Sequence, residues 1–452
     1  MAVNPDPLEP FFKTVQERNL IRHYVQTSTN LMMALPSALN PILSVHLPII
    51  LSSNNQSLHA SIEALRLSLL GVAAIHQSYL LAKSGDENRE AASNMWSLAA
   101  NLRVMASKYL GVAVASIEGC RSDAALGACV SIALIDIFAG GYNYASNLDL
   151  GKTLVSLRGG PAAIVRYSIA YVQGEGALIS TGRLLLEILT VYDTFSTLTS
   201  GEQPALLRPG ETAWWFEGDQ NNYHLYSVEN KFGMSRSIVE LFARVSSFLN
   251  RHRHPPERSS TIVTVEGNPT PNPSRPSTPT LSLSSLRESP PPPGSPLSSL
   301  HAEACTLLRE VEAWNDGPIP VDQMHPRVKF GNYALKSALL ILLLREAFNL
   351  APNDPRVQKC AEMTLLAALK ASADFEMSVD LTWPVIIAGC QCSGPFRTLT
   401  VRALEGFRKQ CCFEIDTSEL IVNEVWRRLD AGLPRADFRS VVEDHNLKVL
   451  IL

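Results

Sequence analysis

The sequence has 452 residues, of which 46% are hydrophobic and 18% are charged, and its formal net charge is −4. This balance is typical of a folded globular protein and excludes a chain that is disordered throughout. The small excess of acidic residues also excludes a general electrostatic attraction to nucleic acid or to anionic membranes. Because the chain is longer than a single core usually serves, we expect two subdomains or one large array.

We find no targeting or membrane segment in the sequence. The first ten residues are polar and acidic, unlike a signal or transit peptide. The most apolar run, Ala338–Leu344, is flanked by Lys336 and Arg345 and is far shorter than the roughly 20 apolar residues of a spanning helix. We therefore expect a buried helix there and no membrane partner. Eight cysteines without an export signal predict free thiols in a reducing compartment.

Helical periodicity dominates the first 254 residues. Between residues 57 and 83 apolar side chains recur at helical spacing, and a polar loop at 84–88 precedes an antiparallel return. Long amphipathic helices joined by short polar loops, without alternating β-branched runs, predict an all-α array of antiparallel helical hairpins. Pro36, Pro41 and Pro48 divide the region before these hairpins into short pieces. Further helices are expected at 123–139, 147–160, 177–198 and 235–250.

The composition changes abruptly after residue 254. The stretch from Pro255 to Pro296 contains 12 of the 29 prolines, mixed with serine and threonine. Such a segment cannot bury enough apolar surface to offset its ordering entropy, so we predict a disordered linker at 255–297. It would separate two helical regions, 1–254 and 298–452.

Four hydroxyl residues of this linker precede a proline, the local pattern that proline-directed kinases read. Phosphorylation there would add negative charge without touching either helical region. The alternative is that serine, threonine and proline are simply common in linkers. The candidate phosphorylation sites are Thr270, Thr278, Ser289 and Ser295.

Helical patterns resume in the second region, and its most informative stretch is Leu381–Gly389. Pro384 lacks a backbone donor and disfavours a helical conformation at the residue before it, so a helix should begin or bend there. We expect the Trp383 indole to be a core anchor between packed helices. The apolar C-terminal end at 448–452 is expected to pack on the body. Other helices are predicted at 298–314, 332–350, 355–373, 399–411 and 418–429.

We find no residue pattern for catalysis or metal binding. Gly151-Lys152-Thr153 matches the end of a phosphate-binding loop, but Ser146 stands where the first glycine is required and no strand precedes it. Lys152 is therefore expected to be a solvated helix residue. The close cysteines lack the paired spacing of zinc sites, and a nucleophile elbow is absent. We predict no catalytic residue, no metal site and no cofactor.

Several residues fit either a structural or a functional interpretation. Asp136 lies in an apolar helix, where burial would raise its pKa or require a partner, and we favour a capping or interhelical hydrogen bond over a pocket acid. The basic cluster Arg251–His254, with Arg258, fits either a nuclear-import patch or a solvated helix end. Four aromatic residues fit either the core or the lining of an apolar pocket between helices: Tyr192, Trp214, Trp215 and Trp383.

Short motifs follow one another in order along almost the whole chain. They are Asn40–Leu51, Ile135–Gly141, Asn147–Gly160, Tyr192–Phe195, Phe232–Ser235, Trp383–Gly389, Arg397 and Trp426. This ordered series resembles the fungal-specific transcription factor domain, an all-helical regulatory region that usually follows a zinc binuclear cluster in fungal regulators. Asn147 stands where that family favours histidine, and Lys152 stands where it favours a small residue.

The resemblance implies a nuclear transcription regulator, with the cytoplasm as a second location, whose helical body binds an effector or partner proteins. The six-cysteine cluster of the family is missing from this sequence, in which Cys120 is the first cysteine, so we assign no residue to DNA binding. The implied partners are the transcription machinery or a separate DNA-binding regulator, a small-molecule effector and a second copy of the chain. The alternatives are a biosynthetic enzyme or accessory protein with an apolar pocket between its helices, and a helical scaffold without a ligand.

Overall fold

The computed structural model describes ten stretches of the chain. All the regular secondary structure within them is helical, which confirms the predicted all-α fold. These stretches are residues 6–35, 40–52, 58–175, 180–217, 228–254, 296–315, 324–375, 381–409, 412–447 and 449–451.

A long hairpin forms the centre of the N-terminal part. Helices α3 (His59–Lys83) and α4 (Arg89–Ala113) pack against each other and are joined by a short turn at Asp86–Asn88. Helices α1 (Val15–Gln26) and α2 (Pro41–Ile50) pack on α3. Within the described residues, α3 meets the length and composition of a membrane-spanning helix, but 78% of its most apolar window is buried in the fold. It is the core helix of this hairpin.

A second group of helices is arranged around α6 (Asp123–Phe138), which is buried along nearly its whole length. It comprises α5 (Ile117–Arg121), α7 (Ala145–Leu157), α8 (Pro161–Glu175) and α9 (Thr181–Ser200). Helix α6 packs on α3, α4, α7 and α9, so it joins the long hairpin to the helices that follow.

Helix α6 begins and ends where the sequence predicts. The Ser122 hydroxyl accepts a hydrogen bond from the first turn, and two glycines with positive φ, Gly140 and Gly141, end the helix. A Cβ on Gly141 would lie 2.8 Å from the carbonyl oxygen of Leu450. The backbone N–H of Leu450 donates to the carbonyl of Gly141 at 3.0 Å, and residues 449–451 are fully buried. The predicted packing of the C-terminal end is confirmed.

Helices α10 to α12 (213–253) complete the first region, and helices α13 to α19 (296–444) form the second. Helix α14 begins six residues earlier than predicted because His325 caps it: the His325 Nδ1 accepts a hydrogen bond from the backbone of Arg327 at 3.1 Å. A π-helical turn at Leu343–Ala347 follows α14. The helices are α10 (Ala213–Phe216), α11 (Val228–Phe232), α12 (Arg236–Arg253), α13 (Pro296–Ala313), α14 (Pro326–Leu342), α15 (Pro355–Phe375), α16 (Thr382–Gly389), α17 (Pro395–Phe407), α18 (Glu414–Asp430) and α19 (Phe438–Asp444).

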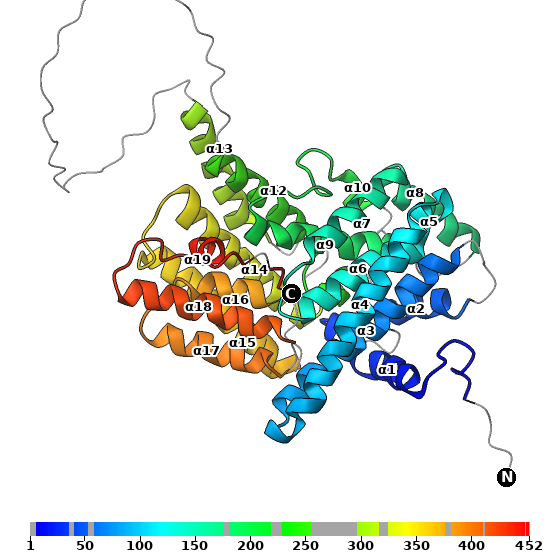
Figure 1. The fold of residues 1–452 in the computed structure, drawn as a ribbon. Coiled ribbons are helices and arrows are strands. Elements are labelled where there is room, and N and C mark those ends of the chain that lie inside the picture. The colour runs from blue at the N-terminus through cyan, green and yellow to red at the C-terminus, as the bar shows by residue number, and fades with distance from the viewer. Residues whose placement is uncertain are drawn as a thin grey trace, which may run out of the picture.

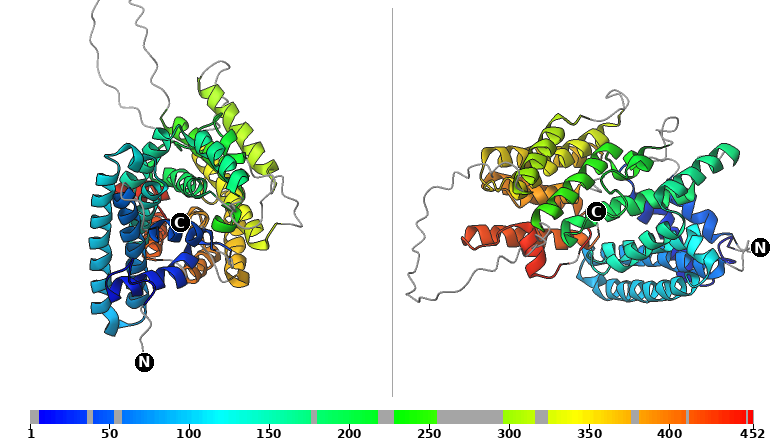
Figure 2. Two further views of the ribbon diagram at one scale, coloured as in Figure 1. Left: turned by 90° about the vertical axis from the view of Figure 1, so that its right-hand side faces the viewer. Right: turned by 90° about the horizontal axis from the view of Figure 1, so that it is seen from above.

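One continuous cluster of buried apolar side chains includes residues from both regions of the chain. Helices α14 to α19 lie beside α3, α4 and α6 (Figures 1 and 2). Helix α9 packs on α6, α12 and α19, and α12 also packs on α14. Polar contacts also cross this boundary: the Tyr79 hydroxyl donates to the carbonyl of Arg408 at 2.6 Å, and the Phe413 N–H donates to the carbonyl of Phe138 at 3.0 Å. The two regions therefore share a core.

Candidate functional site

The four aromatic residues proposed from the sequence are buried: Tyr192 in α9, Trp214 and Trp215 in α10, and Trp383 in α16. Trp215 donates its Nε1–H to the backbone oxygen of Arg236 at 2.9 Å, and the Arg236 guanidinium lies 5.0 Å from the centre of its ring. None of the four lines the cavity or the groove described below. Their contacts are those of core residues.

The residues of the C-terminal motif meet where α16, α17 and α18 pack together. Helix α16 begins at the Trp383-Pro384 pair, as predicted. Trp426 donates its Nε1–H to the carbonyl of Gly389 at 2.8 Å. The Arg397 guanidinium lies 5.1 Å from the Trp426 ring centre and forms two hydrogen bonds of 2.7 Å with Asp430. The motif thus holds three helices together by packing and hydrogen bonding.

Asp136 of α6 has the interhelical partners that the sequence favours. Its Oδ2 lies 2.8 Å from Nη2 of Arg103 in α4, and the Asn147 side chain of α7 donates to the same oxygen at 3.4 Å. Burial raises the pKa of the Asp136 carboxyl, and the Arg103 guanidinium acts against that rise. Asp136 therefore connects three helices.

Lys152 is not the solvated residue that we expected. Its Nζ lies 2.8 Å from Oδ1 of Asp149 and 3.2 Å from Oδ1 of Asp193, and its side chain is only 21% exposed. Asp193 is buried in α9 and also accepts hydrogen bonds from the backbone of Ala205 and Leu206, at 2.6 and 3.0 Å. Lys152 supplies the cation that a buried carboxylate requires.

The basic cluster at the end of α12 is engaged in ion pairs. Arg251 Nη2 lies 2.6 Å from Glu303 of α13, and Arg253 Nη2 lies 3.0 Å from Glu346 of the π-helical turn. These contacts favour the helix-end interpretation, in which the arginines also match the negative end of the helix dipole.

The cysteines and the linker contribute no described site. Cys390 and Cys392 are buried free thiols, as predicted, and burial raises the pKa of Cys392 to about 11. Among the described residues, no group of three or more His, Cys, Asp or Glu side chains is placed to hold a metal ion. The candidate phosphorylation sites Thr270, Thr278, Ser289 and Ser295 lie outside the described residues.

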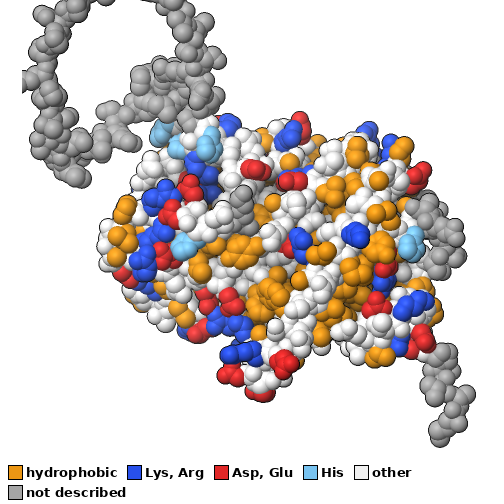
Figure 3. All heavy atoms as spheres, viewed as in Figure 1, with side chains coloured by type: hydrophobic (Ala, Val, Ile, Leu, Met, Phe, Trp, Pro, Cys, Tyr) orange, Lys and Arg blue, Asp and Glu red, His pale blue; other side chains and the backbone are white. Residues whose placement is uncertain are grey.

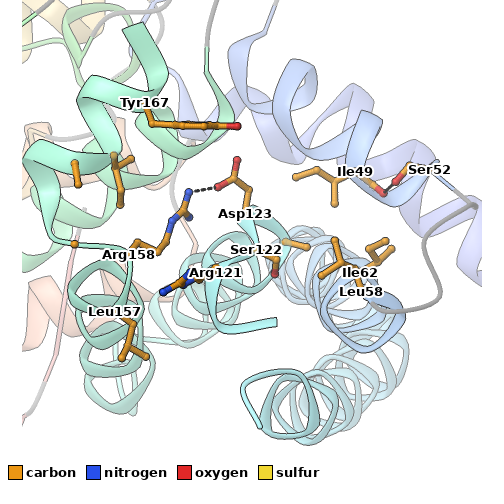
Figure 4. Close-up of a pocket in the computed structure, with 14 residues that line it drawn as sticks. Ile49, Ser52, Leu58, Ile62, Arg121, Ser122, Asp123, Leu157, Arg158 and Tyr167 are labelled. Atoms are coloured by element: carbon orange, nitrogen blue, oxygen red, sulfur yellow. Dashed lines mark hydrogen bonds and ion pairs between the residues drawn. The ribbon is translucent and has the colours of Figure 1, made fainter. Parts of the chain in front are cut away.

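A cavity of about 880 Å³ opens between the ends of six helices, α2, α3, α5, α6, α7 and α8 (Figure 4). We call it the junction cavity. Its volume falls within the range of small-molecule sites in proteins. It is lined by Ile49, Ser52, Leu58, Ile62, Arg121, Ser122, Asp123, Ala124, Leu157, Arg158, Gly159, Ala163, Ile164 and Tyr167.

Two helix-to-helix junctions bring the polar groups into this cavity. Arg121 ends α5 directly before the Ser122 cap of α6, and Arg158 follows the last residue of α7 before the glycines that precede α8. Cations are favoured at helix C-terminal ends, which explains locally why arginines stand at both junctions. Because α6 and α8 start beside each other, the two junctions face one cavity.

The positive ends of three helices also meet at the junction cavity. The N-terminal residues of α3, α6 and α8 line it, and in α3 and α8 no acidic side chain occupies the first turn. In α6, Asp123 takes that position and balances part of the charge. Unsatisfied backbone N–H groups and the helix dipole make such ends favourable for anions.

The charged side chains leave the cavity with a net positive charge. Arg158 Nη2 lies 2.7 Å from Oδ1 of Asp123, so these two charges offset each other. Nη1 of Arg158 is buried and has no hydrogen-bond partner among the described residues. Arg121 is exposed and adds a second guanidinium.

The rest of the lining is apolar. Ile49, Leu58 and Ile62 lie on one side of the Arg158–Asp123 pair, and the Tyr167 ring lies above it (Figure 4). Tyr167 and Leu157 are 70% and 53% exposed, respectively. Large exposed apolar side chains beside a polar cluster are typical of ligand or partner sites. The arrangement suits a molecule with an apolar body and one anionic group.

Sequence reasoning missed this site. It assigned residues 123–139 only to a helix and Asn147–Gly160 only to a family motif. The available signal was an arginine shortly before each of two helix starts, but such arginines are common as ordinary helix ends.

Comparison with known proteins gives one match. The model of the family described as the fungal specific transcription factor domain matches residues 19–452. No curated protein and no solved structure matches the chain significantly. Because the match covers nearly the whole sequence, and the fold is all-α as the resemblance implied, the chain belongs to the fungal specific transcription factor domain family.

Proposed function

We propose that this protein is a transcription regulator whose helical body binds a small amphipathic anion in the junction cavity. Family membership supports a role in transcriptional regulation. The observation that carries the ligand is the cavity itself, which the Arg158 and Arg121 guanidinium groups, two helix starts without acidic first-turn residues and an apolar wall line together.

The positive charge of the junction cavity would make it bind anionic ligands more tightly than neutral ones. An anion would gain hydrogen bonds from guanidinium groups, which are stronger than those between neutral partners. A neutral ligand would bring no opposite charge to the two guanidinium groups that line the cavity. The apolar wall would bind the rest of the molecule by removing hydrocarbon surface from water.

The alternative of a biosynthetic enzyme gains no specific support at this cavity. Among the described residues that line the cavity, Asp123 is the one carboxylic acid, and it is paired with Arg158. These residues therefore offer no free carboxylate as a general base. A regulator needs no such group.

The proposal places the protein in the nucleus, where it would act with the transcription machinery or with a DNA-binding regulator. On the face shown in Figure 3, Lys and Arg side chains are interspersed with Asp and Glu and do not form one basic patch. Together with the net charge of −4, this distribution favours action through protein partners over direct binding of DNA by this chain.

Thermal unfolding of the full chain with matched ligand pairs tests the proposal. We expect carboxylates with an apolar body, such as decanoate and 2-naphthoate, to raise the unfolding temperature more than their uncharged primary amides do. Arg121→Ala should remove this difference, whereas Arg309→Ala, which changes an exposed arginine of α13, should keep it. Equal shifts with acids and amides, or no shift with either, would overturn the proposed ligand class.

A further inference from the structure

A second concave site lies between α15 and α17, helices that do not border the junction cavity. Leu366, Leu369 and Ala373 of α15 face Gly406 of α17 across a groove of about 980 Å³. A Cβ on Gly406 would lie 3.4 Å from Oγ of Ser372, so the missing side chain leaves the floor of the groove open. Leu366 is 51% exposed although it belongs to a well-packed helix. The floor is therefore apolar and accessible.

The rim of this groove is basic. Lys370 of α15 lies on one side, and Arg402 of α17 and Lys409, just beyond the end of α17, lie on the other. Among the described residues no ion pair involves Arg402 or Lys409, and both are exposed. Lys370 Nζ lies 2.8 Å from Asp374 Oδ2, but both side chains are exposed, so this ion pair contributes little free energy. A carboxylate of a partner could readily replace Asp374.

The cations of the rim lie at separate positions. Arg402 lies within α17, whereas Lys409 lies two residues beyond Phe407, the last residue of that helix. Carboxylates at separate positions along a helix lying in the groove would meet both. The nearest exposed acid of α17 in sequence, Glu405, is not among the groove residues.

We propose that the α15/α17 groove binds an acidic amphipathic helix of a partner protein. Leucine-like side chains of the partner would cover Leu366 and Leu369, and its carboxylates would pair with the three cations of the rim. This is recognition of an amphipathic helix in a groove, with charge complementarity setting its orientation. The groove is less suited to single-stranded nucleic acid because none of the described residues that line it has an aromatic side chain for base stacking.

Fluorescence anisotropy with a labelled probe peptide tests this proposal on the full chain. The probe is a 15-residue helix with leucine at positions i, i+3, i+4 and i+7 and glutamate on its flanks. Two comparison peptides have the same leucines with lysine in place of glutamate, and the same composition in scrambled order. We expect only the acidic amphipathic probe to bind wild-type protein, with affinity that falls as salt rises.

Charge reversal makes the test specific. The double variant Arg402→Glu, Lys409→Glu should weaken binding of the acidic probe at least about tenfold and should gain binding of the lysine probe. Lys108→Glu, on the exposed face of α4, should change neither. Leu366→Ala should also weaken the acidic probe, since that side chain is half exposed and its loss leaves the core intact.

Four outcomes would overturn the inference. Three are equal binding of the acidic and scrambled peptides, unchanged binding in the double variant, and a charge-reversal effect seen only with phosphatidylserine vesicles. The last result would assign the groove to an anionic membrane surface. Self-association of the chain that is lost in the double variant, without peptide binding, would assign it to a second copy.

Discussion

The contact between α16 and α17 gives the sharpest test of the packing around the family motif. In Gly389→Ala the new Cβ would lie 2.5 Å from Cγ2 of Thr400. Carbon atoms in contact are normally about 3.5–4.0 Å apart, so the two helices would have to move apart by roughly 1 Å. Overpacking of this kind costs about 1–3 kcal/mol, and the better helix propensity of alanine returns up to about 1 kcal/mol.

We therefore expect Gly389→Ala to lower the free energy of unfolding by roughly 1–2 kcal/mol, measured by urea denaturation followed by circular dichroism. Gly111→Ala is the matched control, because a Cβ there meets nothing within 4 Å and should stabilise α4 by about 0.5–1 kcal/mol. Adding Thr400→Ser removes the clashing methyl group and keeps the hydroxyl that donates to the carbonyl of Phe396. This second change should recover most of the loss. A Gly389→Ala protein as stable as wild type, or a loss that Thr400→Ser does not repair, would refute this reasoning.

Three further predictions concern buried polar groups, each measured by urea denaturation. Burial raises the pKa of Glu414 from 4.5 to about 7. The folded state therefore favours the protonated carboxyl, and its contribution to stability is full below pH 4.5 and is lost as the pH rises to about 7. Glu414→Gln should then be roughly 3 kcal/mol more favourable relative to wild type at pH 8 than at pH 4, and a pH-independent difference would contradict this. Trp426→Phe removes the hydrogen bond to the carbonyl of Gly389 and should cost about 1–3 kcal/mol; no loss would mean that water replaces the indole. Asp193→Ala leaves Lys152 without its buried partner and should cost about 3–5 kcal/mol, whereas a neutral effect would show that Asp149 suffices.

The helical fold could be predicted from the sequence because its signals are local. Apolar periodicity located the long hairpin, the helix predicted at 123–139 corresponds to α6, and the Trp383-Pro384 pair located the start of α16. Each of these depends on residues within a few positions of one another. The early start of α14 was missed because a histidine cap is uncommon.

The junction cavity could not be predicted because its residues come from separate helix ends. Arg121 and Arg158 are 37 positions apart, and each has an ordinary local explanation as the end of a helix. Only tertiary packing places both of them beside the same apolar wall. The same reason explains the error at Lys152, whose partner Asp193 lies on another helix.

The central claim is that the helical body regulates transcription through the junction cavity, and a tethered reporter assay tests it most directly. The full chain is fused to an unrelated DNA-binding module in fungal cells, and reporter output is compared for wild type, Arg121→Ala and Arg309→Ala. The account predicts that wild type changes the output relative to the module alone, that Arg121→Ala alters this change, and that Arg309→Ala does not. Output equal to that of the module alone, or identical output from all three proteins, would contradict it.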